Sequence, residues 1–266
     1  MIAAVRSEFL KYFTTRLWWG MALGIAVSSA LFAGFMGWAL TSKSPQAGGP
    51  TGLPQGTAVQ VANSVYTAGL GIGYVLLLTI GVLTIGAEYR HKTISGTFLS
   101  TPRRVTAMGA KAIALLGIGA LNGLIAVLGS VAVGAVVLNA RGHDPFPSSE
   151  VFRTMALSLL VLGLWALIGL GVGILIKNQV AALLIGVGVA WIVEPIVGLL
   201  LSFWDWGAKH VVQYLPSQAT SAVVNSVTQG PDVARLSWWA AALVLAAYAV
   251  VLAGFGVWRT TREDIS

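Results

Sequence analysis

The sequence predicts an all-α membrane protein with six transmembrane helices, and three observations support this fold class. Hydrophobic residues make up 56% of the 266 residues and charged residues only 9%, whereas a soluble domain carries roughly a quarter charged residues. Six stretches are apolar over roughly 20 residues or more, enough to cross a ~30 Å hydrocarbon core. Within them Leu, Ile, Val, Ala and Gly run continuously, without the alternating pattern of a membrane β-strand. We therefore expect a single transmembrane domain over residues 1–266.

Residues 2–16 precede the first span and have the pattern of an amphipathic helix. Such a helix would lie in the membrane interface. The alternative, a cleaved signal peptide, is disfavoured because the apolar run that follows has full spanning length and five more follow it. The expected apolar face holds Ile2, Val5, Phe9 and Phe13, and the opposite face holds Arg6, Glu8, Lys11 and Thr15.

The predicted spans are residues 17–40, 61–87, 112–138, 155–176, 180–202 and 236–258. The only charged residue inside them is Glu194, which precedes Pro195. A carboxylate inside a membrane is a functional-site hypothesis by default. Two interpretations of Glu194 stay open: a packing role with a hydrogen bond to a neighbouring helix, and contact with a substrate or proton along a transport path.

The loops between the spans carry an asymmetric charge that predicts orientation. Eleven of the sixteen basic residues fall on one side with four acidic residues, so that side holds the whole formal charge of +7. Basic residues near span ends are retained in the cytoplasm, so we expect both termini to be cytoplasmic in a multi-pass plasma-membrane protein. The pattern offers no basic groove for nucleic acid. The eleven residues are Arg6, Lys11, Arg16, Arg90, Lys92, Arg103, Arg104, Lys111, Lys177, Arg259 and Arg262.

The two longest loops on the outer side differ in character. Residues 41–60 are rich in Pro and Gly and are typical of a surface loop. Residues 203–235 begin with Phe203, Trp204, Asp205 and Trp206, and paired tryptophans suit a membrane interface. The stretch 208–227 is too polar to span, and it fits either short or re-entrant helices or a plain loop.

Glycines four residues apart recur inside the predicted spans. This spacing lets two helices approach closely, and close packing explains these glycines better than a nucleotide fingerprint, which none of them completes. The pairs are Gly69/Gly73, Gly119/Gly123 and Gly169/Gly173.

The common catalytic and nucleotide-binding motifs are absent from the sequence. It has no phosphate loop, no His-Glu-x-x-His and no Gly-x-Ser-x-Gly. Its histidines, His91, His143 and His210, fall in three loops on two sides of the membrane and cannot share a metal. We expect a chain that is not itself an enzyme and binds no cofactor or metal.

The most informative segment is the cytoplasmic loop between the second and third spans, residues 88–111. Thr93, Ile94, Phe98 and Leu99 could form an amphipathic turn or two before Pro102. Such an element would offer an apolar patch with charged edges to a cytosolic partner. On composition alone, an ordinary solvated loop fits as well.

This loop resembles the first cytoplasmic loop of type-2 ABC exporter permeases, the transmembrane subunits of ATP-driven export systems. The pattern is Glu88-Tyr-Arg, then Thr93-Ile94, Thr97, Pro102-Arg103-Arg104 and Lys111. An interfacial N-terminal helix, six spans and a longer segment after the fifth also match that layout. Many relatives have a second acidic residue after the first glutamate, where this chain has Arg90, His91 and Lys92.

The resemblance implies that this loop holds a coupling helix, which inserts into a separate cytosolic ATPase subunit. The ATPase would bind ATP and Mg, and the permease would pair with a second permease, identical or homologous. The residues that the resemblance places at the ATPase contact are Glu88, Tyr89, Arg90, Thr93, Ile94, Thr97, Phe98, Leu99, Pro102, Arg103 and Arg104.

Two other classes of function remain as alternatives. A stand-alone secondary transporter or channel would favour several intramembrane charges or broken helices in matching halves, and the spans offer only Glu194. A membrane-embedded enzyme would need a cluster of polar catalytic residues at one membrane face, which the sequence does not show. The apolar spans do not identify the cargo.

Overall fold

The computed structural model describes residues 1–42, 56–93, 96, 104–225 and 235–262. These residues form helices joined by short connections, and none of them is in a strand. Within this part of the chain six helices are long and apolar enough to cross a membrane, as a multi-pass membrane protein requires. This confirms the predicted all-α fold class and the number of spans. The candidate spans are Leu17–Thr41, Ala58–Arg90, Val105–Ala140, Glu150–Leu175, Gln179–Ser202 and Trp238–Gly256.

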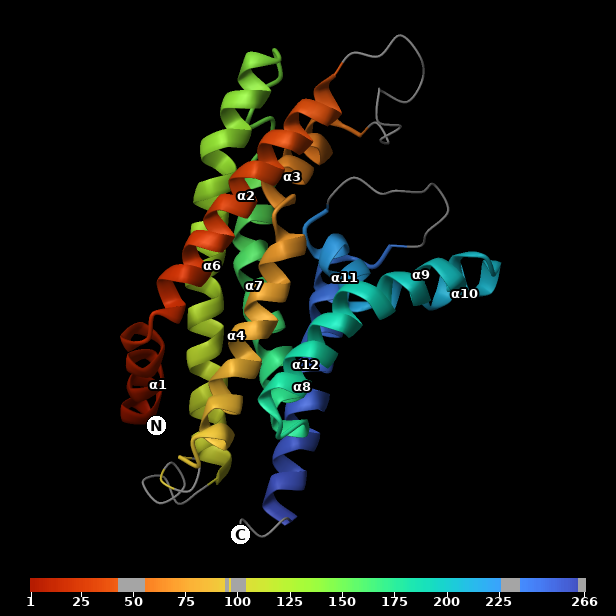
Figure 1. Ribbon diagram of the computed structural model, residues 1–266. Helices are drawn as coiled ribbons and strands as arrows, with labels where there is room; N and C mark the ends of the chain where they lie inside the picture. The colour runs from red at the N-terminus through yellow and green to blue at the C-terminus, as the bar shows by residue number, and fades with distance from the viewer. Residues whose placement is uncertain (43–55, 94–95, 97–103, 226–234, 263–266) are drawn as a thin grey trace.

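The helices form an elongated bundle in which α7 is central (Figure 1). α7 packs against α4, α6 and α12, and α2 lies along α6. α1 lies beside the lower part of α6, and the N-terminus and the last residues of α12 are at the lower end in Figure 1. The elements are α1 Ile2–Thr14, α2 Leu17–Thr41, α3 Ala58–Thr67, α4 Leu70–Arg90, α6 Arg104–Ala140, α7 Glu150–Leu175, α8 Gln179–Gly188, the π-helix η1 Val189–Val193, α9 Glu194–Ser202, α10 Asp205–His210, the 3₁₀-helix η2 Val212–Tyr214, α11 Pro216–Val223 and α12 Trp238–Arg262.

Several helices begin earlier in the sequence than the predicted spans. The third helix begins at Arg104 rather than at 112, so Lys111 lies inside it. The fourth begins at Glu150 rather than at 155. The second begins at Ala58, where Thr57 and Gln60 form a capping box, and it is interrupted between α3 and α4. An uncharged run therefore locates a span but underestimates its helix.

The glycine spacing does mark close helix contacts, as predicted. A Cβ at Gly169 of α7 would overlap the backbone of α4 at Leu78, and one at Gly119 of α6 would overlap the backbone of α7 at Gly163. A Cβ at Gly69 would overlap Ser29 of α2. These helices can approach this closely only because the glycines lack side chains.

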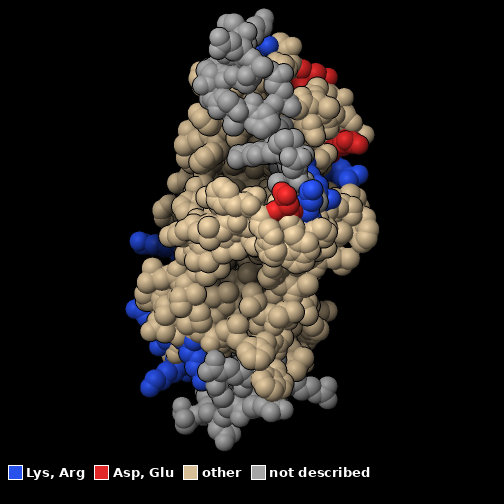
Figure 2. Space-filling view, turned by 90° about the vertical axis from the view of Figure 1, so that its right-hand side faces the viewer, with Lys and Arg blue, Asp and Glu red and all other residues tan. Residues whose placement is uncertain are grey.

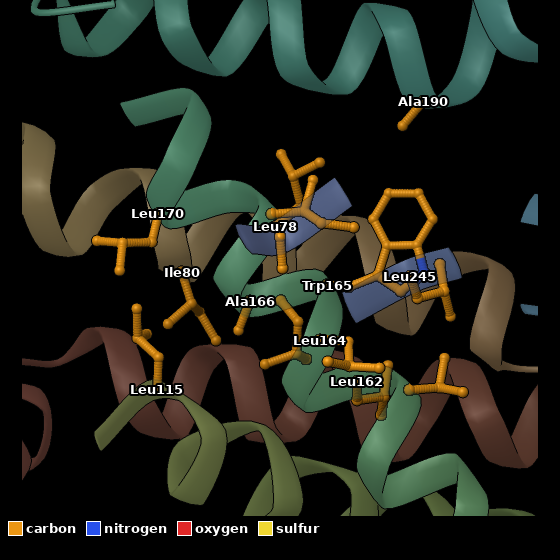
Figure 3. Packing of buried hydrophobic residues seen from close by; sticks show 14 of the residues in the cluster. Leu78, Ile80, Leu115, Leu162, Leu164, Trp165, Ala166, Leu170, Ala190 and Leu245 are labelled. Carbon is orange, nitrogen blue, oxygen red and sulfur yellow. The ribbon is translucent and has the colours of Figure 1, made fainter. Parts of the chain in front are cut away.

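The main apolar core lies between α4, α6, α7 and α12, and Figure 3 shows Leu78, Leu162, Trp165 and Leu245 within it. Trp165 stacks on Tyr74 of α4 with ring centroids 4.3 Å apart. Its Nε1 donates a 2.9 Å hydrogen bond to Oγ1 of Thr220 in α11. A buried indole that reaches a polar partner costs little to bury, and this bond fixes α11 against α7.

The segment after the fifth span contains short helices, which were one of the two structures expected for it; the other was a plain loop. α10, η2 and α11 occupy residues 205–223, and residues 226–234 lie outside the described part. α9 and α10 extend away from the bundle in Figure 1, whereas α11 packs against α12. The described part of the segment is thus helical and not plain loop.

Charge is distributed unevenly on the surface. On the face shown in Figure 2, acidic side chains are visible only on the upper half, whereas basic ones also appear on the lower half. Two of the acidic residues near the lower end, Glu8 and Glu88, are buried instead. On this face the lower half therefore shows basic side chains but no described carboxylate.

Candidate functional site

Glu88, the first residue of the predicted coupling loop, lies in the last turn of α4 and points into the protein. Its side chain is only 7% exposed. The residue opposite is Lys111 of α6, which is fully buried, with its Nζ 2.6 Å from Oε1 of Glu88. A buried ion pair thus joins the last turn of α4 to α6 about two turns after α6 begins.

α1 adds a second carboxylate and a second ammonium to this pair. Lys111 Nζ also donates to Oε2 of Glu8 at 2.9 Å. Lys11 Nζ donates to Oε1 of Glu8 at 2.7 Å and to Oε1 of Glu88 at 2.8 Å. We call Glu8, Lys11, Glu88 and Lys111 the charge cluster. It joins three helices, α1, α4 and α6, through four ion pairs.

The cluster meets most of the conditions under which charges can be buried, although Oε2 of Glu88 is buried without a hydrogen-bond partner among the described residues. Two ammonium and two carboxylate groups leave no net charge, and hydrogen bonds accompany every pairing. Burial acts to lower the pKa of Lys11, but the hydrogen bonds and negative charges of Glu8 and Glu88 outweigh it and raise that pKa above its usual value. Lys11 therefore stays protonated throughout the physiological pH range.

A further polar contact fixes α1 at the same place. Asn122 of α6 donates from Nδ2 to the Tyr12 hydroxyl at 3.2 Å, and both side chains are buried. Glu8 and Tyr12 are the buried residues of α1, one helical turn apart on the same face. α1 thus binds α6 through these polar side chains together with Phe9, whose ring lies against Gly117 of α6.

The structure buries one residue of the face of residues 2–16 that was expected to be polar. Glu8 lies inside the protein, whereas Ile2 and Phe13 of the expected apolar face are exposed. The reason is that Glu8 has two ammonium partners inside the protein, which helical periodicity alone cannot reveal. The helix itself is present, from Ile2 to Thr14.

The other predicted coupling residues are only partly described. Tyr89 packs against the main core, and Arg90 is exposed at the end of α4. Thr93 directly follows the turn after α4, and Arg104 begins α6. The predicted contacts at Ile94, Thr97, Phe98, Leu99, Pro102 and Arg103 lie outside the described residues.

Sequence reasoning missed three members of the cluster, Glu8, Lys11 and Lys111, as parts of a site. One signal was available: Glu and Lys three residues apart in a short helix, with another Lys at the start of a span, in a chain with only nine acidic residues. What the sequence does not show is that these helices meet.

Glu194 lies far along the chain from this cluster, at the start of α9 directly after the π-helix η1. It is buried, and its Oε1 accepts a 2.5 Å hydrogen bond from the backbone N–H of Ser217 in the first turn of α11. A carboxylate at this position satisfies one of the N–H groups that every helix start leaves without an intrahelical partner. The packing interpretation of Glu194 thus has a partner in the structure.

A scan against protein-family models gives no match for this sequence, and a search of curated proteins gives none either.

Proposed function

We propose that this chain is the transmembrane permease subunit of an ATP-driven exporter of the type-2 ABC kind. It would form the substrate path together with a second permease, identical or homologous. A separate cytosolic subunit would bind ATP and Mg and hydrolyse the ATP. The resemblance of residues 88–111 to the coupling loop of that family motivates the proposal, and the six spans agree with it.

The observation that carries the proposal is the charge cluster at the base of the loop. Glu88 and Lys111 bracket residues 89–110, and their 2.6 Å contact ties the two ends of the loop together. Lys11 and Glu8 connect this base to α1. A displacement of the loop would therefore move α1, α4 and α6 as one body, which is the kind of rigid movement that a cytosolic motor requires.

In this proposal the lower end of the bundle in Figure 1 faces the cytoplasm. That orientation places both termini and the loop between α4 and α6 on the side of the ATPase, in agreement with the retention of basic residues there. α1 would lie in the interface with Ile2, Leu10 and Phe13, which are all exposed, toward lipid. Glu194 would act in packing, by holding α11 to α9.

A second candidate, a stand-alone secondary transporter, is favoured by one observation. The first turn of α4, directly after the interruption between α3 and α4, contacts the π-helix η1, where Trp191 Nε1 donates to the carbonyl of Gly71 at 3.2 Å. Interrupted spans often form transport sites. Ion-coupled transport would nevertheless favour several intramembrane charges, and the spans contain only the carboxylate of Glu194.

Affinity purification of the tagged full chain from its native membrane distinguishes the two candidates. The exporter proposal predicts that an ATPase with a Walker motif copurifies, and that reconstituted vesicles hydrolyse ATP only when both subunits are present. A secondary transporter would purify without an ATPase and would respond to an ion gradient instead. That result would refute the exporter proposal.

A further inference from the structure

A cavity of about 940 Å³ lies beside the charge cluster, between α1, α4 and α6. α1 packs on α6 and α2, and the Lys11–Glu88 ion pair reaches across to α4 at 2.8 Å. The volume falls within the roughly 300–1,000 Å³ of small-molecule sites. The cavity beside the ion pair is therefore large enough to hold a small-molecule ligand.

The lining changes from charged to apolar with depth. Glu88 and Lys111 line the charged part. Leu83 precedes Glu88 by five residues, roughly 7 Å along α4, and Ile118 follows Lys111 by seven, roughly 10 Å along α6. Alanines such as Ala87 line the space between these levels. A polar mouth above an apolar interior fits an amphiphile.

The charge that a ligand can reach in this cavity is positive. Lys11 has a 48% exposed side chain, whereas Glu8 and Glu88 are 7% exposed and Lys111 is fully buried. An ammonium group has three donors, and Lys11 gives two of them to the carboxylates. The third can serve an anion.

Exposed polar residues surround Lys11 in the lining. Ser7, Thr15 and His91 line the cavity. Ser7 precedes Lys11 by four residues in α1, so the two side chains share one face of that helix.

We propose that the cavity binds one anionic phospholipid. Its phosphate accepts hydrogen bonds from Lys11 Nζ and from the hydroxyl of Ser7, and its acyl chain enters the alanine-lined space toward Leu83 and Ile118. Basic pockets between membrane helices bind anionic headgroups for the same electrostatic reason. The bound lipid fills the gap between α1 and α4. This inference requires the chain to sit in a membrane, and it does not rest on the exporter proposal.

Native mass spectrometry of the purified, delipidated full chain tests the proposal. The protein is titrated with phosphatidylglycerol, phosphatidylcholine or inorganic phosphate. We expect one phosphatidylglycerol to bind at least tenfold more tightly than phosphatidylcholine, and inorganic phosphate to compete weakly because it lacks the chain. Phosphate that competes as well as the lipid, or equal binding of the two lipids, would overturn the proposal.

Two variants with matched controls locate the site. Lys11→Ala should weaken phosphatidylglycerol binding about tenfold, whereas Lys92→Ala, at an exposed lysine outside the cavity lining, should not. Ala87→Phe places a large side chain in the cavity without removing a charge and should abolish the tight binding, whereas Ala140→Phe, at the end of α6 outside the cavity lining, should leave it unchanged. Tight, selective binding by the Ala87→Phe variant would place the lipid elsewhere and refute the proposal even if Lys11→Ala does not fold.

Discussion

Removal of the Lys111 ammonium should destabilise the protein more than any other single change at the lower end. Lys111→Met keeps the length of the side chain but deletes the contacts to Glu8 at 2.9 Å and to Glu88 at 2.6 Å. The two carboxylates, each 7% exposed, then share only Lys11 and leave a net buried negative charge.

The magnitude follows from the burial of these groups. Breaking a buried ion pair by removing one partner typically costs 3–5 kcal/mol, because the remaining charge is left uncompensated. Lys111 has no exposed surface, so solvent screening does not reduce this cost. The control is Lys92→Met, the same chemical change at an exposed lysine next to α4, for which a change within about 0.5 kcal/mol is expected.

Urea unfolding in detergent, followed by tryptophan fluorescence, measures the difference in unfolding free energy. The double variant Glu88→Gln/Lys111→Met should be less destabilised than the sum of its two single variants, because the second change removes the orphaned charge. If Lys111→Met unfolded at the same urea concentration as Lys92→Met, the charge cluster would not hold the base of the loop.

Three further predictions concern other parts of the fold. Glu194→Gln keeps an acceptor for the Ser217 N–H and should change the unfolding free energy little. Glu194→Leu leaves that N–H unpaired and should cost about 1–3 kcal/mol of unfolding free energy. Equal costs for the two variants would contradict a capping role. Gly169→Ala should lower the melting temperature clearly, because overpacking costs about 1–3 kcal/mol, and Gly188→Ala, which meets open space, should not. A cysteine introduced at Ser149 should react with an impermeant maleimide in intact cells, and one introduced at Ser266 should not. The sequence has no native cysteine to interfere. The reverse labelling would invert the proposed orientation.

The sequence was enough to predict the number of spans and the close helix contacts at glycines, because both depend on local composition. Continuous apolar runs identified six helices, and glycine pairs such as Gly119/Gly123 identified close contacts. The ends of the helices were less predictable. α6 extends past Lys111 to Arg104 because a charge with a buried partner does not end a helix.

The charge cluster could not be predicted in the same way because its members are far apart in the sequence. Glu8 and Lys111 are 103 residues apart, and only the packing of α1 on α6 brings them together. For Glu194 the sequence suggested a hydrogen bond to a neighbouring helix, but not that the partner would be a backbone N–H of the short helix α11.

The most direct test of the proposed function is the binding of an ATPase subunit to the loop between α4 and α6. An apolar anchor at such an interface contributes about 2 kcal/mol or more, equivalent to roughly a thirtyfold loss of affinity when it is removed. A chain with Phe98→Ala and Leu99→Asp should insert normally into the membrane yet lose the copurifying ATPase and ATP-driven export, while Arg103→Ala and Arg104→Ala should have milder effects. Full ATPase binding and export by the Phe98/Leu99 double variant would contradict the coupling role of this loop.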